Sequence, residues 1–180
     1  MKMAKKLLAL VLTGVMAMSV LTGCGSTASR QAAGKLEGML EGMLKEANPN
    51  ATVEVGSETL ANTAIDAATK DGEIKTDAIT SIVAALKNAN KNEYVWYTYF
   101  KAEGKNETDK AREISKKVLI GDGKAIDDTG ALNGLSLKNK GYKPGDEFVL
   151  SMKEFTVTND DKTTTDWIMA VVTCKGVENK

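Results

Sequence analysis

Residues 147–175 read EFVLSMKEFTVTNDDKTTTDWIMAVVTCK, and this stretch predicts a β-hairpin at the end of the chain. Two segments rich in β-branched and apolar residues, 147–158 and 163–175, flank a polar run at 159–162 that is typical of a turn. In the first strand the large apolar residues change face between Met152 and Phe155. This change of phase predicts a bulge or bend near residues 153–154.

The segment 93–102, EYVWYTYFKA, is the most aromatic part of the chain. Large side chains occupy both alternating faces, which predicts an interior strand covered on two sides. Trp96, Tyr97 and Tyr99 are the candidate ligand-binding residues, because their rings could form a platform for a sugar or a peptide. The alternative is that these rings only pack in the core, as aromatic residues of strands ordinarily do.

Apolar residues at helical spacing predict helices over residues 31–47, from 57 to about 69, after Thr76, and over about 107–120. A short strand is expected at 51–55. Helices thus precede and interrupt the strands, and a hairpin ends the chain. This order predicts a single α+β domain over residues 31–180, with an antiparallel sheet of three to four strands and helices packed on it.

Two segments give weaker signals. The first helix carries Gly34, Gly38 and Gly42 at a spacing of four, so either another backbone packs closely there or the helix is weak; we favour a weak helix. Residues 122–146 show no long periodic pattern, which indicates a functional loop or a short element hidden at 131–137. Lys-Pro-Gly-Asp at 143–146 predicts a closing turn.

The composition excludes several kinds of chemistry. The 180 residues include 24 basic and 24 acidic side chains, no histidine, and only Arg30 and Arg112 as arginines. Histidine-dependent catalytic triads, histidine-ligated zinc and arginine-rich nucleic-acid surfaces are therefore ruled out. The glycine at 121 begins the nearest approach to a phosphate-binding loop, but the motif does not fit and follows a helix. We predict no nucleotide, no nucleic-acid partner and no cofactor.

Carboxylates are the only abundant acid–base groups, so a small carboxylate-dependent hydrolase is the catalytic alternative. Acidic loop residues occur at 122, 127–128 and 160–161, and neither group has the ligand spacing of a calcium loop. We therefore assign no metal site and no catalytic residue from the sequence.

The amino terminus has the three parts of an export signal. Lys2, Lys5 and Lys6 make a positive start, and an apolar run over residues 7–21 follows that is too short to span a bilayer. The run ends in Leu21-Thr22-Gly23-Cys24. This combination resembles the signal peptide and lipobox of bacterial lipoproteins. The alternative is an ordinary signal peptide that happens to contain a cysteine.

The resemblance to lipoproteins implies a location and a modification. Residues 1–23 would be cleaved, Cys24 would carry a diacylglyceryl group, and residues 24–30 would be a tether to the membrane. Two acyl chains anchor stably where one does not. Loss of the three signal lysines leaves a net charge of −3, so the lipid rather than the protein surface would hold the chain to the membrane.

Lipidation of Cys24 would leave Cys174 without a disulfide partner. Cys174 ends an apolar strand, which predicts a small buried hydrophobe rather than a reactive thiol. Together these features predict a non-catalytic binding module of the cell envelope, anchored by lipid to the cell membrane outside the cytoplasm. Its ligand would be a protein, a peptide or a glycan.

Overall fold

The computed structural model describes residues 27–119 and 130–179. The predicted signal peptide, Cys24 and the acidic residues 122 and 127–128 lie outside the described residues. Helix α2 spans Thr27–Lys45, so residues 27–30, which were expected to be tether, are helical.

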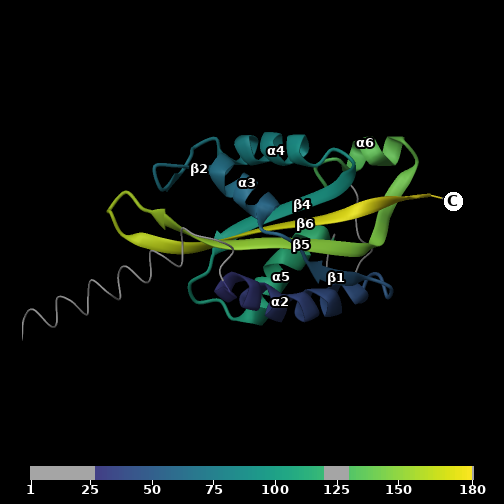
Figure 1. Cartoon of the computed structure of the whole chain (residues 1–180), viewed down its shortest axis with the longest axis horizontal. Helices are drawn as coiled ribbons and strands as arrows, with labels where there is room; N and C mark the ends of the chain where they lie inside the picture. The colour runs from purple at the N-terminus through teal and green to yellow at the C-terminus, as the bar shows by residue number, and fades with distance from the viewer. Residues whose placement is uncertain (1–26, 120–129, 180) are drawn as a thin grey trace, which may run out of the picture.

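The predicted α+β fold is confirmed (Figure 1). Four strands form one sheet in the order β1-β5-β6-β4, where β1 is Thr52–Val55, β4 is Glu93–Lys101, β5 is Tyr142–Thr158 and β6 is Thr164–Glu178. The predicted hairpin is the pair β5–β6, and β4 joins β6 antiparallel. β1 pairs with β5 in parallel, so the sheet is mixed rather than wholly antiparallel. Alternation in the sequence predicts a strand but carries no information on its direction.

Helices cover both faces of the sheet. Helix α2 and helix α5 (Glu107–Val118) lie on one face, whereas helix α3 (Thr59–Ala68) and helix α4 (Ala78–Ala89) lie on the other (Figure 1). A small hairpin of β2 (Thr69–Lys70) and β3 (Glu73–Ile74) follows α3, and the short helix α6 (Gly134–Asn139) precedes β5. Helix α6 begins inside the stretch where a hidden element was expected.

The sheet therefore separates two apolar cores. Phe148 and Leu150 belong to the core beneath α2 and α5, and Phe155 and Val157 belong to the core beneath α3 and α4. The β5–β6 register is continuous from Phe148 to Thr158, so the predicted bulge near residues 153–154 is wrong. The change of phase in the sequence instead marks the point where the buried face of the strand changes from one core to the other.

A bulge does occur earlier in β5, where the sequence predicted a turn. Residues 143–146 belong to the strand, and the pairing with β6 shifts between Pro144 and Phe148. A Cβ added to Gly145 would lie 3.1 Å from the Lys175 carbonyl oxygen and 3.2 Å from Val177 Cγ1. Glycine is needed at this position because β5 approaches β6 closely there, and not because the chain makes a reverse turn.

The aromatic strand differs from its prediction in one important respect. β4 is covered on both faces, as expected, but it is an edge strand of the sheet. Trp96 and Trp167 also lie against different cores, because Trp96 belongs to the core of α2 and α5 and Trp167 packs against the other. Coverage of both faces and pairing of both edges are independent properties, and the sequence pattern reports only the first.

Candidate functional site

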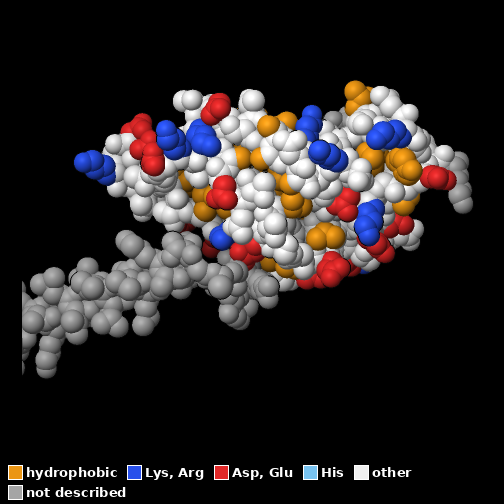
Figure 2. All heavy atoms as spheres, turned by 45° about the horizontal axis from the view of Figure 1, so that its top comes forward, with side chains coloured by type: hydrophobic (Ala, Val, Ile, Leu, Met, Phe, Trp, Pro, Cys, Tyr) orange, Lys and Arg blue, Asp and Glu red, His pale blue; other side chains and the backbone are white. Residues whose placement is uncertain are grey.

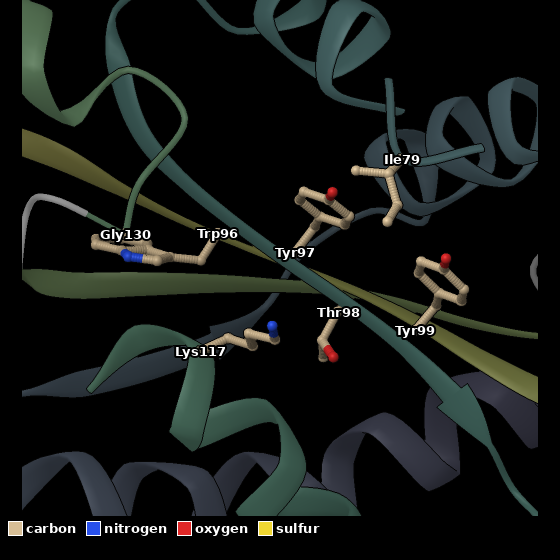
Figure 3. Close-up of a pocket in the computed structure, with 7 residues that line it drawn as sticks. All are labelled: Ile79, Trp96, Tyr97, Thr98, Tyr99, Lys117 and Gly130. Carbon is tan, nitrogen blue, oxygen red and sulfur yellow. The ribbon is translucent and has the colours of Figure 1, made fainter. Parts of the chain in front are cut away.

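A cavity of about 260 Å³ lies along the free edge of β4 (Figure 3). It brings together all three aromatic residues that the sequence singled out: Trp96, Tyr97 and Tyr99. Thr98 completes the strand wall, and residues from three other segments close the cavity: Ile79 of α4, Lys117 of α5, and Gly130. The three candidate residues thus line one cavity, although they point in different directions.

The alternation of the strand divides the cavity into two sides (Figure 3). Tyr97 and Tyr99 lie on the side of α4, where Ile79 is 61% exposed beside them. Trp96 and Thr98 lie on the opposite side, with Lys117. One side of the cavity therefore carries two phenol rings and an aliphatic side chain, and the other carries an indole, a hydroxyl group and a cation.

The two tyrosines are half-buried, and their hydroxyl groups have no hydrogen-bond partner among residues 27–119 and 130–179. Burial, and to a smaller extent the neighbouring Tyr99 phenol, raise the pKa of Tyr97 above its ordinary value of 10.0. The Tyr97 phenol is neutral near pH 7, as an ordinary phenol is, and it can both donate and accept a hydrogen bond. Tyr99 also packs against Trp167, with 5.9 Å between the ring centroids.

Trp96 is the most deeply buried of the three aromatic residues that line the cavity. The side chain is 1% exposed and stacks on Tyr94 at a centroid distance of 5.9 Å. Its indole Nε1 is buried without a hydrogen-bond partner in the described part of the chain. A Cβ added to Gly130 would lie 3.7 Å from this nitrogen, so the indole edge borders the glycine. A buried donor of this kind is costly to leave unpaired, but its burial keeps it out of reach of a ligand in the cavity.

The main chain of β4 adds polar groups to the cavity. The Ala102 N–H donates to the Asp166 carbonyl oxygen of the neighbouring strand at 2.8 Å. Because N–H and C=O groups of successive residues alternate in direction along an antiparallel strand, even-numbered residues pair with β6 and odd-numbered ones face outward. The Val95 carbonyl oxygen confirms this direction, since it accepts from the Leu132 N–H at 2.8 Å.

The segment after Gly130 closes only the first part of this edge. Besides Leu132, Asn133 Nδ2 donates to the Glu93 carbonyl oxygen at 3.2 Å. Beyond Val95, no residue within 27–119 or 130–179 pairs with the outward N–H and C=O groups of Tyr97 and Tyr99. The open edge, defined here as the outward main chain of Tyr97 and Tyr99, coincides with the cavity.

At the opposite edge of the sheet, a glutamate side chain caps strand β1. The Val53 N–H of β1 donates to Glu41 Oε2 of α2 at 3.1 Å. Glu41 also forms an ion pair with Lys45, and this pair together with the Val53 hydrogen bond lowers the pKa of the Glu41 carboxyl group. Capping by a charged side chain is one way in which proteins protect exposed strand edges. Among the described residues, no side chain caps the outward N–H groups of Tyr97 and Tyr99 in this way.

Four residues of the cavity were missed by the sequence: Ile79, Thr98, Lys117 and Gly130. Ile79 falls on the same apolar stripe of its helix as Ile82 and Leu86, which are buried. The structure leaves it 61% exposed in the lining of the cavity. An apolar residue on a buried stripe looks the same in the sequence whether or not a strand lies beneath it, so no local signal identifies it.

A second cavity, of about 480 Å³, lies at the other end of the sheet near β1. Its lining includes four carboxylates, Glu37, Glu54, Glu93 and Glu147, together with Lys175. Within the described residues, no group of three or more histidine, cysteine, aspartate or glutamate side chains is placed to hold a metal ion. At the β5–β6 turn, Asp161 Oδ1 accepts from the Thr163 N–H at 3.0 Å, so this acidic side chain stabilises its own turn.

Cys174 borders the second cavity and is a free, buried thiol. Burial raises its pKa from 9.0 to about 12, so it is protonated at neutral pH. We expect a thiol reagent to label folded Cys174 slowly and unfolded Cys174 rapidly. Rapid stoichiometric labelling without denaturant would contradict this placement.

The same shift predicts a dependence of stability on pH. Between about pH 9 and pH 12 the folded thiol keeps its proton while the unfolded thiol loses it, so stability falls as pH rises through this window. Cys174→Ala should lack this component. Urea denaturation of both proteins across the window isolates it, because the other titrating groups are shared.

Around the first cavity the surface is mixed. Figure 2 shows small groups of apolar side chains between charged ones of both signs on the face that carries α3 and α4.

Among the described residues, no helix has both the length and the apolar character required to cross a bilayer. No protein-family model matches the chain, and no curated protein or solved structure is detectably similar to it.

Proposed function

We propose that this chain is a lipid-anchored binding module outside the cytoplasm, with its ligand site in the cavity along β4. The anchoring part rests on the lipobox that ends in Cys24. The binding part rests on one observation: Trp96, Tyr97 and Tyr99 line a single cavity that also exposes Ile79 and Lys117. Aromatic rings combined with a few polar groups are typical of ligand sites.

The lining of this cavity favours binding over catalysis. It includes phenols, an indole, a hydroxyl group and an ammonium group, and no carboxylate is among its described residues. These groups hold and orient a ligand, but they provide no pair of carboxylates for acid–base hydrolysis. The alternative hydrolase would instead use the glutamate-lined cavity near β1, where the carboxylates are gathered.

Anchoring is tested by replacement of Cys24. We expect Cys24→Ala to remove the protein from the membrane fraction, because the acyl chains supply the membrane affinity. Detergent-phase partitioning of the two forms measures this. Cys174→Ala is the matched control, since it removes the other cysteine and should leave partitioning unchanged. Equal partitioning of Cys24→Ala and the unchanged protein would contradict lipid anchoring.

Ligand binding is tested by replacement of Tyr97. Its ring and hydroxyl group line the cavity, so Tyr97→Ala should weaken binding of a soluble envelope glycan or peptide about tenfold or more. Isothermal titration with a panel of such compounds provides the measurement. Leu135→Ala, which removes a side chain that is 70% exposed and is not among the residues lining the cavity, is the control. A ligand that binds both variants equally would place the site elsewhere.

A further inference from the structure

We propose that the ligand of the β4 cavity is an extended polypeptide that adds to the sheet as a strand beside β4, with alternating apolar and acidic side chains. This inference rests on the proposed binding function and specifies its ligand. It depends on three features of the cavity: its main-chain groups, its two unlike sides, and the charge of Lys117.

The main-chain groups favour a peptide over a glycan. Tyr97 and Tyr99 each present an outward N–H donor and C=O acceptor, and the two residues are about 7 Å apart along a strand. An extended peptide repeats its own donors and acceptors at the same interval, so it can pair with both residues. The hydroxyl groups of a sugar chain do not repeat with this spacing and polarity.

The two sides of the cavity specify alternating side chains. A strand added beside β4 directs successive side chains to opposite faces of the sheet. On one face they would meet Tyr97, Tyr99 and the exposed Ile79, which favours apolar residues (Figure 3). On the other face they would meet Lys117, which is exposed and makes no ion pair with any described residue. That face favours an acidic residue.

The contacts already made by β4 limit how far along the strand a peptide can pair. Farther along β4, Leu132 already occupies the edge at Val95. An added strand would therefore pair with Tyr97 and Tyr99 and end before Val95.

A second copy of this chain is a less favourable occupant. Two β4 edges paired antiparallel about a two-fold axis would place both copies of α5 on the same face of the joined sheet. The two Lys117 side chains would then approach one another without a described acidic partner. Like charges brought together in this way oppose pairing, whereas an acidic peptide removes the repulsion.

The first experiment removes the outward N–H group of Tyr99. The probe is a capped eight-residue peptide of alternating valine and glutamate, titrated into the full chain in detergent. Tyr99→Pro deletes the donor but leaves the β4–β6 pairing intact, because Tyr99 faces away from β6. Tyr99→Ala removes the same ring and keeps the donor. We expect Tyr99→Pro to bind about tenfold more weakly than Tyr99→Ala, with unchanged circular dichroism.

The second experiment tests the charge. Lys117→Glu should weaken binding of the valine–glutamate peptide roughly threefold and strengthen binding of an alternating valine–lysine peptide. Lys116→Glu is the matched control, because it makes the same charge change next to the cavity without lining it. We expect it to change neither affinity by more than a fraction of this effect.

A third measurement uses peptides methylated on alternate amide nitrogens. One methylation register blocks the N–H groups that face β4 and should abolish binding, while the other faces solvent and should preserve it. Equal tolerance of both registers would overturn strand addition, as would absence of binding by the valine–glutamate peptide at millimolar concentration. A dimer that Tyr99→Pro converts to a monomer would also overturn it, in favour of a second copy. A glycan that loses affinity on Tyr97→Ala would overturn this inference and leave the proposed binding function standing.

Discussion

Trp96→Ala is expected to lower the free energy of unfolding by about 3–5 kcal/mol. Trp96 is 1% exposed, stacks on Tyr94 and packs against Phe148 with 6.2 Å between ring centroids. Removal of the indole leaves a cavity in the core beneath α2 and α5, which the surrounding strands cannot fill. This loss is a large share of the total free energy of unfolding of a typical domain, which is about 5–15 kcal/mol. Urea denaturation followed by circular dichroism measures it.

Trp167→Ala is the matched control for Trp96→Ala. Trp167 is only partly buried, and it packs against the other core. We expect a smaller loss of stability, because part of the indole already contacts water. If the two variants lost the same free energy of unfolding, the deeper burial of Trp96 would not make it more important for stability than Trp167. The expectation for Trp96→Ala would then be wrong.

Leu40→Ala is expected to lower the free energy of unfolding by about 2–5 kcal/mol. Leu36, Leu40 and Leu44 of α2 are all 0% exposed, so this helix contributes fully to the first core. The sequence favoured a weak helix because of its three glycines. The structure places these glycines in open space, with nothing in the described residues within 4 Å of an added Cβ. The helix is thus held by its leucines despite its glycines.

Gly38→Ala separates packing from helix propensity. Gly38 lies in the same helix as Leu40 and meets no neighbour, so alanine should raise the free energy of unfolding by up to about 1 kcal/mol. The two substitutions therefore have opposite signs within one helix. If Leu40→Ala were silent, α2 would be a detachable segment. If Gly38→Ala were destabilising, a partner would have to cover the glycine row.

The secondary structure was largely predictable from local pattern. The helices at 59–68, 78–89 and 107–118, the strand at 93–101 and the final hairpin all lie close to their predicted positions. Asn106 illustrates why: its side chain accepts from the Asp109 N–H at 2.9 Å, which is the cap expected of an asparagine before a helix. Such interactions connect residues a few positions apart, and a single sequence contains them in full.

The candidate site was only half predictable. The sequence identified Trp96, Tyr97 and Tyr99, because a strand with large residues on both faces stands out by composition alone. It did not place that strand at the edge of the sheet, and it did not supply Ile79 or Lys117. Those facts depend on which strand pairs with which, and on where the helices that precede and follow the strand in the sequence come to lie.

The residues by themselves determined the elements, the α+β class and the aromatic character of β4. Only the tertiary structure decided that β1 runs parallel to β5 and that the sheet divides two cores. It also decided that no described residue pairs with the outward main chain of Tyr97 and Tyr99. The physical reason is the range of the interactions. Periodicity and capping act over one or two turns, whereas strand order follows from burying both faces of one sheet at once, and that requirement involves the whole chain.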